Sequence, residues 1–142
     1  MKNCKTFKIK KIHFLKIKLG EELVSALTSF CQKKKIEKGI VVGIGALKKA
    51  KFGYFDQRKK KFFQLEKKGP LEIVSLLGNI SLKEKKSFLH IHIALADKKG
   101  NVFGGHLIEG IVFAGEMKIL EIEGEKIERA FDSETGLFLW QI

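Results

Sequence analysis

Cysteine, arginine and long apolar runs are all scarce in this 142-residue sequence, and each shortage excludes a class of protein. Cys4 and Cys31 lie far apart and match no metal-ligand spacing such as Cys-x-x-Cys, so reduced thiols in a cytoplasmic protein are expected rather than a disulfide framework. The apolar residues of segment 1–20 are interleaved with lysines, which does not fit a signal peptide. No segment approaches the length of a membrane span, so no membrane association is expected.

Basic charge is abundant but is carried almost wholly by lysine. The net charge is +12, and only Arg58 and Arg129 are arginines among 28 basic residues. Residues 1–99 hold 25 basic and 8 acidic side chains, whereas residues 100–142 hold 3 and 8. The candidate nucleic-acid contacts are Lys33, Lys34, Lys35, Lys48, Lys49, Arg58, Lys59, Lys60 and Lys61. Because base recognition favours arginine, these clusters predict contact with DNA phosphates rather than with bases, and a merely solvated surface would explain the same charge.

Three histidines within a 17-residue stretch give the strongest chemical signal. Residues 89–96 alternate between apolar and other side chains, which predicts a strand with His90 and His92 on one face. The following residues 97–101 favour a turn. If that turn is centred on its middle residue, His106 lies directly opposite His92 in a β-hairpin, and all three imidazoles share a face.

Three imidazoles on one face predict a divalent-metal site. Directly opposed residues hold their Cβ atoms roughly 4.5 to 5.5 Å apart, and His90 lies one strand repeat, about 7 Å, from His92. Three protein ligands leave a fourth position open to water or a ligand, and the ligand type favours zinc over nickel, cobalt or iron. Gly104 and Gly105 indicate either a close backbone approach or a bulge, and a bulge would shift the pairing of His106. The alternative is that His90 and His92 are half-buried strand residues that hydrogen-bond to neighbours and hold no metal. His13 lies apart, in the basic N-terminal segment, and is expected to be structural or exposed.

The remaining pattern predicts one α+β domain over residues 1–142, with a mainly antiparallel sheet and one main helix packed on it. Residues 21–35 repeat apolar side chains at spacings of three and four, with acidic residues in the first turn and lysines in the last, which predicts the helix. Further strands are predicted at residues 15–19, 40–46, 51–55, 61–65, 71–77, 111–113, 118–122 and 137–142, with a break at Gly69–Pro70. The apolar segment 137–142 is expected to insert into the sheet or to be covered by another subunit.

Several segments together resemble the plant and prokaryote conserved (PPC) domain, which follows the AT-hooks of plant nuclear proteins and stands alone in prokaryotes. The matching segments are LGEEL (19–23), GIGA (43–46), YFD (54–56), EIVSL (72–76), GNI (78–80), LHIHIALAD (89–97) and FGGHL (103–107). They extend over nearly the whole chain, and the two histidine-bearing segments are the most specific of them.

The resemblance implies a trimer of compact α+β domains that holds a divalent metal, with His90, His92 and His106 in the ligand positions of prokaryotic members. Glu116 stands where members of the family often have an acidic residue, so the resemblance also implies a role for it, either near the metal site or at a subunit interface. The sequence has no Arg-Gly-Arg-Pro AT-hook, so the minor-groove recognition of the plant proteins does not carry over.

Three functions remain open. The first expectation is a trimeric, cytoplasmic metal-binding protein with a DNA-binding or regulatory role. The second is a zinc-dependent, hydrolase-like enzyme acting on a small substrate, in which Glu116 or Glu109 transfers protons. The third is an interaction scaffold whose histidines satisfy one another.

Overall fold

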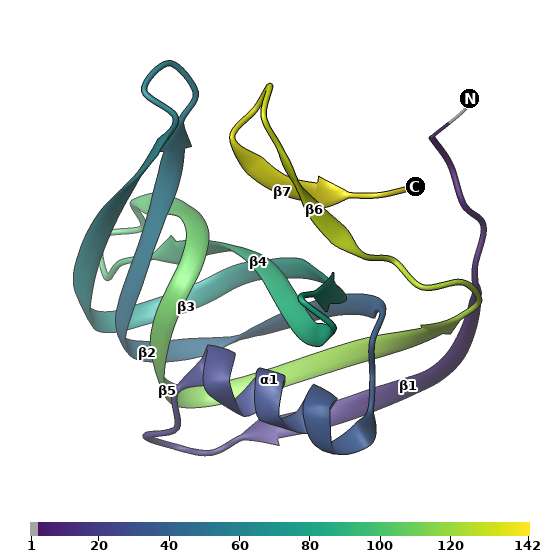
Figure 1. Ribbon diagram of the computed structural model, residues 1–142. Helices are drawn as coiled ribbons and strands as arrows, with labels where there is room; N and C mark the ends of the chain where they lie inside the picture. The colour runs from purple at the N-terminus through teal and green to yellow at the C-terminus, as the bar shows by residue number, and fades with distance from the viewer. Residues whose placement is uncertain (1–2) are drawn as a thin grey trace.

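The computed structural model describes residues 3–142 and contains seven strands and one helix over that range (Figure 1). The elements are β1 (Lys8–Ile17), α1 (Leu23–Lys34), β2 (Gly39–Asp56), β3 (Lys61–Lys83), β4 (Lys86–Ala96), β5 (Val102–Glu123), β6 (Arg129–Asp132) and β7 (Leu137–Trp140). The first five strands form an antiparallel sheet in the order β1-β5-β2-β3-β4. The predicted α+β class, with a mainly antiparallel sheet and one main helix, is confirmed.

The long strand β5 organises the sheet because it pairs with β1, β2 and β4 along different parts of its length. Since β2 also pairs with β3, and β3 with β4, the four strands β2 to β5 form a closed circuit of pairings. Large apolar side chains, among them Leu47, Phe52, Leu95 and Ile119, are fully buried by this closure. The first half of β5 is thereby held beside β4, which brings the two histidine-bearing segments together.

Several strands are longer than predicted. In three cases, two strands predicted separately form one continuous strand in the structure: 40–46 and 51–55 in β2, 61–65 and 71–77 in β3, and 111–113 and 118–122 in β5. The strand predicted at 15–19 begins earlier, at Lys8, and ends at Ile17. Register shifts, such as the one between Leu47 and Lys49, interrupt the apolar alternation without ending the pairing. The predicted break at Gly69–Pro70 is wrong for the same reason. Pairing with β2 lapses between Lys68 and Leu71 and then resumes, so the proline lies where the ladder is already irregular.

The helix α1 packs against β4 and β5, as predicted, but it is shorter than residues 21–35 (Figure 1). It buries Leu23, Leu27 and Cys31, which recur at a spacing of four on one face. The predicted acidic first turn is wrong, because Glu22 precedes the helix and acts as its N-cap.

The C-terminal strands β6 and β7 form a separate two-stranded sheet, called here the C-terminal hairpin (residues 129–140; yellow in Figure 1). Of the two alternatives predicted for residues 137–142, insertion into the main sheet is therefore wrong, and cover by another subunit stays a prediction. The segment that leads into the hairpin is anchored on the end of β3, where the Leu82 amide donates to the Ile127 carbonyl at 2.8 Å. The tip of the hairpin meets the β2–β3 turn, where Lys60 donates to the Ser133 carbonyl at 3.0 Å. Within residues 3–142, no helix combines the length and the apolar character that crossing a membrane requires.

Candidate metal centre and its pocket

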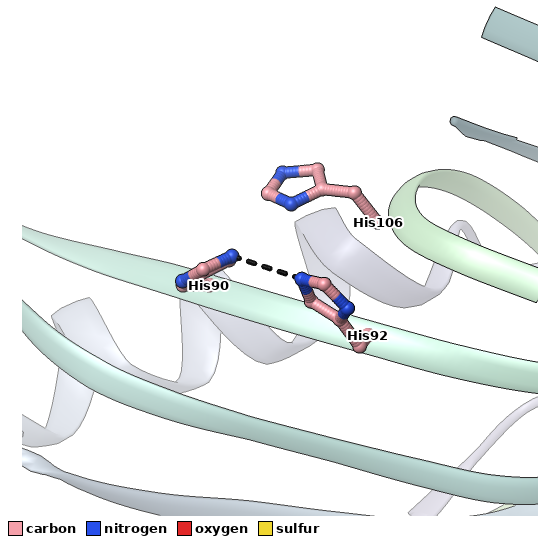
Figure 2. A group of neighbouring side chains, drawn as sticks. All are labelled: His90, His92 and His106. Atoms are coloured by element: carbon pink, nitrogen blue, oxygen red, sulfur yellow. Dashed lines mark hydrogen bonds between the residues drawn. The ribbon is translucent and has the colours of Figure 1, made fainter. Parts of the chain in front are cut away.

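The hairpin of β4 and β5 places the three histidines as the sequence predicts. His92 is paired directly with His106, and the register runs without a shift from there to the turn. His90 lies two residues before His92 on β4, so its side chain is on the same face. Figure 2 shows the three imidazole rings converging from these two strands. Periodicity and turn position were therefore sufficient to predict this juxtaposition.

Two glycines permit the close approach of the strands that carry the histidines. A Cβ atom on Gly104 would collide with the carbonyl oxygen of Ile93 on β4. A Cβ atom on Gly105, whose φ is +152°, would collide with the carbonyl oxygen of Gly53 on β2. Of the two predicted explanations for this glycine pair, close backbone approach is the one that the β4–β5 pairing supports.

The distances between the imidazoles suit a single metal ion. The candidate ligand nitrogens of His90, His92 and His106 all lie within 4.8 Å of one another. The Nε2 atoms of His90 and His92 are 3.2 Å apart (Figure 2). Two nitrogens bound to one tetrahedral zinc at 2.0 to 2.1 Å are separated by about 3.3 Å. The donor set therefore fits zinc with small adjustments of the third ring, and it could bind a metal.

The surroundings of the cluster favour the neutral imidazole that a metal needs. Burial lowers the pKa of His90 to about 4, and the neighbouring His106, Arg129 and His92 lower it in the same direction. Burial, followed by His92 and Arg129, also lowers the pKa of His106. A neutral imidazole can offer its lone pair to a metal without first losing a proton.

A pocket of about 670 Å³ opens above the histidines. Its floor is formed by His90, His92 and His106, and aromatic side chains of β2, β3 and β4 line its walls. The roof is made by residues 136–139 of the C-terminal hairpin. A volume of this size lies within the range of small-molecule sites, so the open coordination position would face a space that a ligand can enter.

Two cations in this pocket were not identified from the sequence. Arg129 of β6 and Lys83 at the end of β3 both line it. Lys83 lies seven residues before His90 and reaches the same space through the pairing of β3 with β4. Arg129 lies 23 residues beyond His106 and reaches it only through the docking of the C-terminal hairpin. One signal was available: Arg129 is one of two arginines in a chain that otherwise uses lysine.

Glu116 and Glu109, the predicted proton-transfer residues, do not line the pocket. Glu116 lies ten residues beyond His106 on β5, roughly 30 Å along the strand, and is paired with Lys16 and Ile44. Glu109 is paired with Lys51 on β2. Neither carboxylate is therefore placed to act at the histidines of its own chain, and a subunit-interface role for Glu116 stays a prediction.

The predicted nucleic-acid contacts are dispersed, and all of them are exposed except Lys49, which is partly buried. Lys33, Lys34 and Lys35 end the helix, and Arg58, Lys59 and Lys60 occupy the β2–β3 turn that leads into Lys61. Lys48 lies at a register shift in the middle of β2, and its neighbour Lys49 forms an ion pair with Glu66 at 3.0 Å. The predicted contacts thus lie in three different parts of the fold: the end of α1, the middle of β2 and the β2–β3 turn.

His13 has a partner that the sequence did not reveal. Its Nε2 lies 3.1 Å from a carboxylate oxygen of Glu121 on the neighbouring strand β5, and Lys10 donates to the other oxygen at 2.7 Å. The ring is half-buried and meets Phe30 of the helix edge-on. His13 is therefore structural, as one of the two predicted alternatives had it, and lies apart from the cluster.

Comparison with known proteins identifies the family. Residues 4–123 match the model of the Plants and Prokaryotes Conserved (PCC) domain. The chain belongs to this family. The match ends where β5 ends, so the C-terminal hairpin lies outside it, and the extension of one PPC domain over all of residues 1–142 stays a prediction.

Several solved structures share the fold along nearly the whole chain. A metal-containing protein from Archaeoglobus fulgidus is 44% identical, with a TM-score of 0.92 over 96% of this chain and 97% of that one. A PPC protein from Pyrococcus horikoshii is 42% identical, with a TM-score of 0.93 over 98% and 96% of the two chains. A protein from Bacteroides thetaiotaomicron, named as a candidate DNA-binding protein, is 29% identical, with a TM-score of 0.87 over 96% and 98%.

Curated relatives share the sequence only over part of their length. The bifunctional protein GlmU from Synechococcus sp. (strain JA-3-3Ab) is 27% identical over 129 residues, which are 89% of this chain and 20% of the relative. The chain thus spans about a fifth of the length of that protein.

Proposed function

We propose that this protein is a divalent-metal-binding PPC protein in which His90, His92 and His106 hold the ion, with zinc as the metal. The observation that carries the proposal is the convergence of three ligand nitrogens within 4.8 Å at the floor of a pocket. Three imidazoles form a zinc site with one open coordination position. The metal-containing relative from Archaeoglobus fulgidus, at 44% identity, supports the same assignment.

DNA is the proposed macromolecular partner, in a regulatory role within the cytoplasm. The net charge of +12 and the exposed basic patches on α1 and the β2–β3 turn favour contact with phosphates. The Bacteroides thetaiotaomicron relative, named as a candidate DNA-binding protein, supports this partner. The two free cysteines, one exposed and one buried, fit a reducing compartment.

A homotrimer is the proposed assembly. Large apolar side chains remain exposed on β1, β2 and β5, including Phe14 at 76%, Ile44 at 57% and Phe113 at 61%. Apolar surface of this extent is typical of interfaces between subunits. Sedimentation equilibrium of the untagged protein would give a mass near 48 kDa, three times 16.1 kDa, if the trimer forms.

A metal-dependent enzyme acting on a small substrate is the second candidate, and the pocket above the histidines favours it. A metal bound there would supply Lewis-acid chemistry. The chain's own contribution would be to exclude water with the aromatic walls and to orient the substrate beneath the hairpin. Glu116 and Glu109 do not reach the pocket of their own chain, so this candidate needs another proton-transfer group.

Metal content measured by mass spectrometry on protein purified without a histidine tag tests the main proposal. We expect about one metal ion per chain in the wild type and a loss of that ion in His92→Ala and His106→Ala. His13→Gln is the matched control, because it removes a histidine outside the cluster while keeping a side chain that can bond to Glu121. A wild-type protein that contains no metal after incubation with zinc would refute the metal site.

A DNA-binding titration at several salt concentrations tests the second part. If Lys59, Lys60 and Lys61 contact phosphates, replacing all three with glutamine lowers the slope of log K against log salt by about 2.7, at 0.9 for each contact. An unchanged slope would exclude the β2–β3 turn from the DNA interface.

A further inference from the structure

Arg129 is held in a fixed position at the edge of the pocket. Its Nε donates to Ser81 Oγ at 2.8 Å, its Nη2 to Asn79 Oδ1 at 2.7 Å and its Nη1 to the Phe138 carbonyl at 2.8 Å. The first two acceptors belong to β3 and the third to β7, so the guanidinium bridges the main sheet and the C-terminal hairpin. Three of its five N–H groups are thereby occupied, and one remains on each terminal nitrogen.

The charge of Arg129 has no counter-ion in the described part of the chain. None of the ion pairs among residues 3–142 includes it. The side chain is half-buried, and burial lowers the pKa of its guanidinium. All three of its acceptors are neutral, so the positive charge is desolvated without being neutralised. A buried charge of this kind is costly unless an anion completes it.

The remainder of the pocket is also electropositive. Lys83 lines it, with its ammonium 3.8 Å from the ring centroid of Phe138. Over residues 3–142, no aspartate or glutamate contributes to the lining. A divalent ion on the three histidines would add two further positive charges. All charged groups around this space therefore have the same sign, which selects for an anion.

The walls match the apolar part of an organic molecule. Tyr54, Phe62, Phe88 and Phe138 line the pocket together with Leu137. The ring centroids of Phe62 and His106 are 5.4 Å apart. The Cζ atom of Arg129 lies 5.4 Å from the ring centroid of Phe88. Aromatic rings therefore lie beside both the histidines and the arginine.

We infer that this pocket binds a small organic carboxylate, with the carboxylate on Arg129 and an apolar or aromatic body against the aromatic walls. The two free N–H groups of the guanidinium, one on each terminal nitrogen, can donate to the two carboxylate oxygens. The inference rests on the proposed function only in that the other end of the ligand would face the metal. The contact with Arg129 itself needs no metal.

The rarity of arginine allows a direct test on the wild-type protein. Arg58 and Arg129 are the only arginines, so an arginine Nε–H correlation spectrum of nitrogen-15-labelled protein contains at most two side-chain signals, which Arg58→Lys assigns. The Nε–H of Arg129 is bonded to Ser81, which favours its detection. The probes are phenylacetate and its neutral analogue phenylacetamide. We expect saturable movement of the Arg129 signal with phenylacetate, at least about tenfold weaker binding of phenylacetamide, and no movement of the Arg58 signal.

Variants then connect the signal to affinity. Calorimetry on Arg129→Gln is expected to show at least about a tenfold loss of phenylacetate binding, whereas Lys126→Gln, which removes a charge from an exposed site, binds like the wild type. Trp140 is the single tryptophan and its ring lies 5.7 Å from the Arg129 guanidinium. Its fluorescence therefore reports whether the C-terminal hairpin stays docked in Arg129→Gln. If the hairpin undocks in this variant, the spectra of the wild-type protein decide whether Arg129 binds the carboxylate. An Arg129 signal that is silent, or that moves equally with both probes, overturns the inference.

The same spectra, recorded on zinc-loaded and chelator-treated protein, separate this inference from the metal proposal. A response of Arg129 in a protein that never binds zinc supports the carboxylate site and refutes the metal site. A protein that binds zinc but whose Arg129 signal does not move supports the metal site and refutes the carboxylate site.

Discussion

Adding one methyl group at Gly104 should separate His92 from His106 and so remove the metal site without touching a ligand. A Cβ atom at this position would meet the carbonyl oxygen of Ile93 far inside van der Waals contact, and that atom is backbone, which cannot rotate away. Only a displacement of β4 from β5 relieves the collision, and the two strands are paired over just five residue pairs. Gly104→Ala is therefore expected to cost about 1 to 3 kcal/mol, the usual range for overpacking, and to lower the melting temperature by roughly 2 to 4 °C per kcal/mol.

The matched control is Gly110→Ala on the same strand. A Cβ atom there would first meet the Leu47 side chain at 3.1 Å, which can adjust, so a smaller loss is expected. Thermal unfolding and zinc content of both variants are measured in parallel. Gly104→Ala should lose stability and bind less than half the zinc of Gly110→Ala. If Gly104→Ala unfolds like the wild type and keeps its full metal content, the argument that close strand approach positions the histidines is wrong.

Two further predictions concern the helix. Burial raises the pKa of Glu22, but hydrogen bonds from Ser25, Gly110 and Val24 outweigh it, so the pKa lies below its ordinary value of 4.5. A carboxyl whose pKa is lowered in the folded state stabilises the protein above its unfolded pKa and loses that contribution as the pH falls through the folded value. Glu22→Gln should therefore be about 1 kcal/mol less stable than the wild type at pH 7 in urea titrations, and this difference should close as the pH falls below 4.5. Burial also raises the pKa of the Cys31 thiol to about 12, so a thiol reagent should modify one cysteine per native chain, the exposed Cys4, and two after denaturation; rapid labelling of both in native protein would contradict the buried helix face.

The histidine cluster was predictable because it depends on local rules alone. Strand periodicity places His90 and His92 on one face, and a turn of known position fixes the partner of each residue. Hairpin register is a short-range property, so the pairing of His92 with His106 needs nothing from the rest of the chain. The same reasoning failed for the lengths of β2, β3 and β5, because register shifts disturb the alternation on which strand boundaries were predicted.

The helix boundary shows a different limit. Glu21 and Glu22 fit the composition of a first turn, since acidic side chains favour that end of the helix dipole. The structure uses the Glu22 carboxylate instead to accept from the amides of Val24 and Ser25, and from Gly110 of β5. That third donor comes from a segment 88 residues away. A cap whose partners include a distant strand cannot be distinguished from a first-turn residue by local pattern.

The position of Arg129 was the hardest to predict from the sequence. Its three acceptors lie on β3 and β7, and it lines the pocket only because the C-terminal hairpin docks on β3 and on the β2–β3 turn. Segment 137–142 was judged by its apolar character, which does not indicate where the segment docks, and four of its large apolar side chains remain exposed in the single chain: Phe138, Leu139, Trp140 and Ile142. Composition nevertheless held a usable signal. In a chain with 26 lysines and two arginines, an arginine marks a position that needs a planar cation with several hydrogen bonds. A guanidinium held only by neutral acceptors keeps its charge for a ligand.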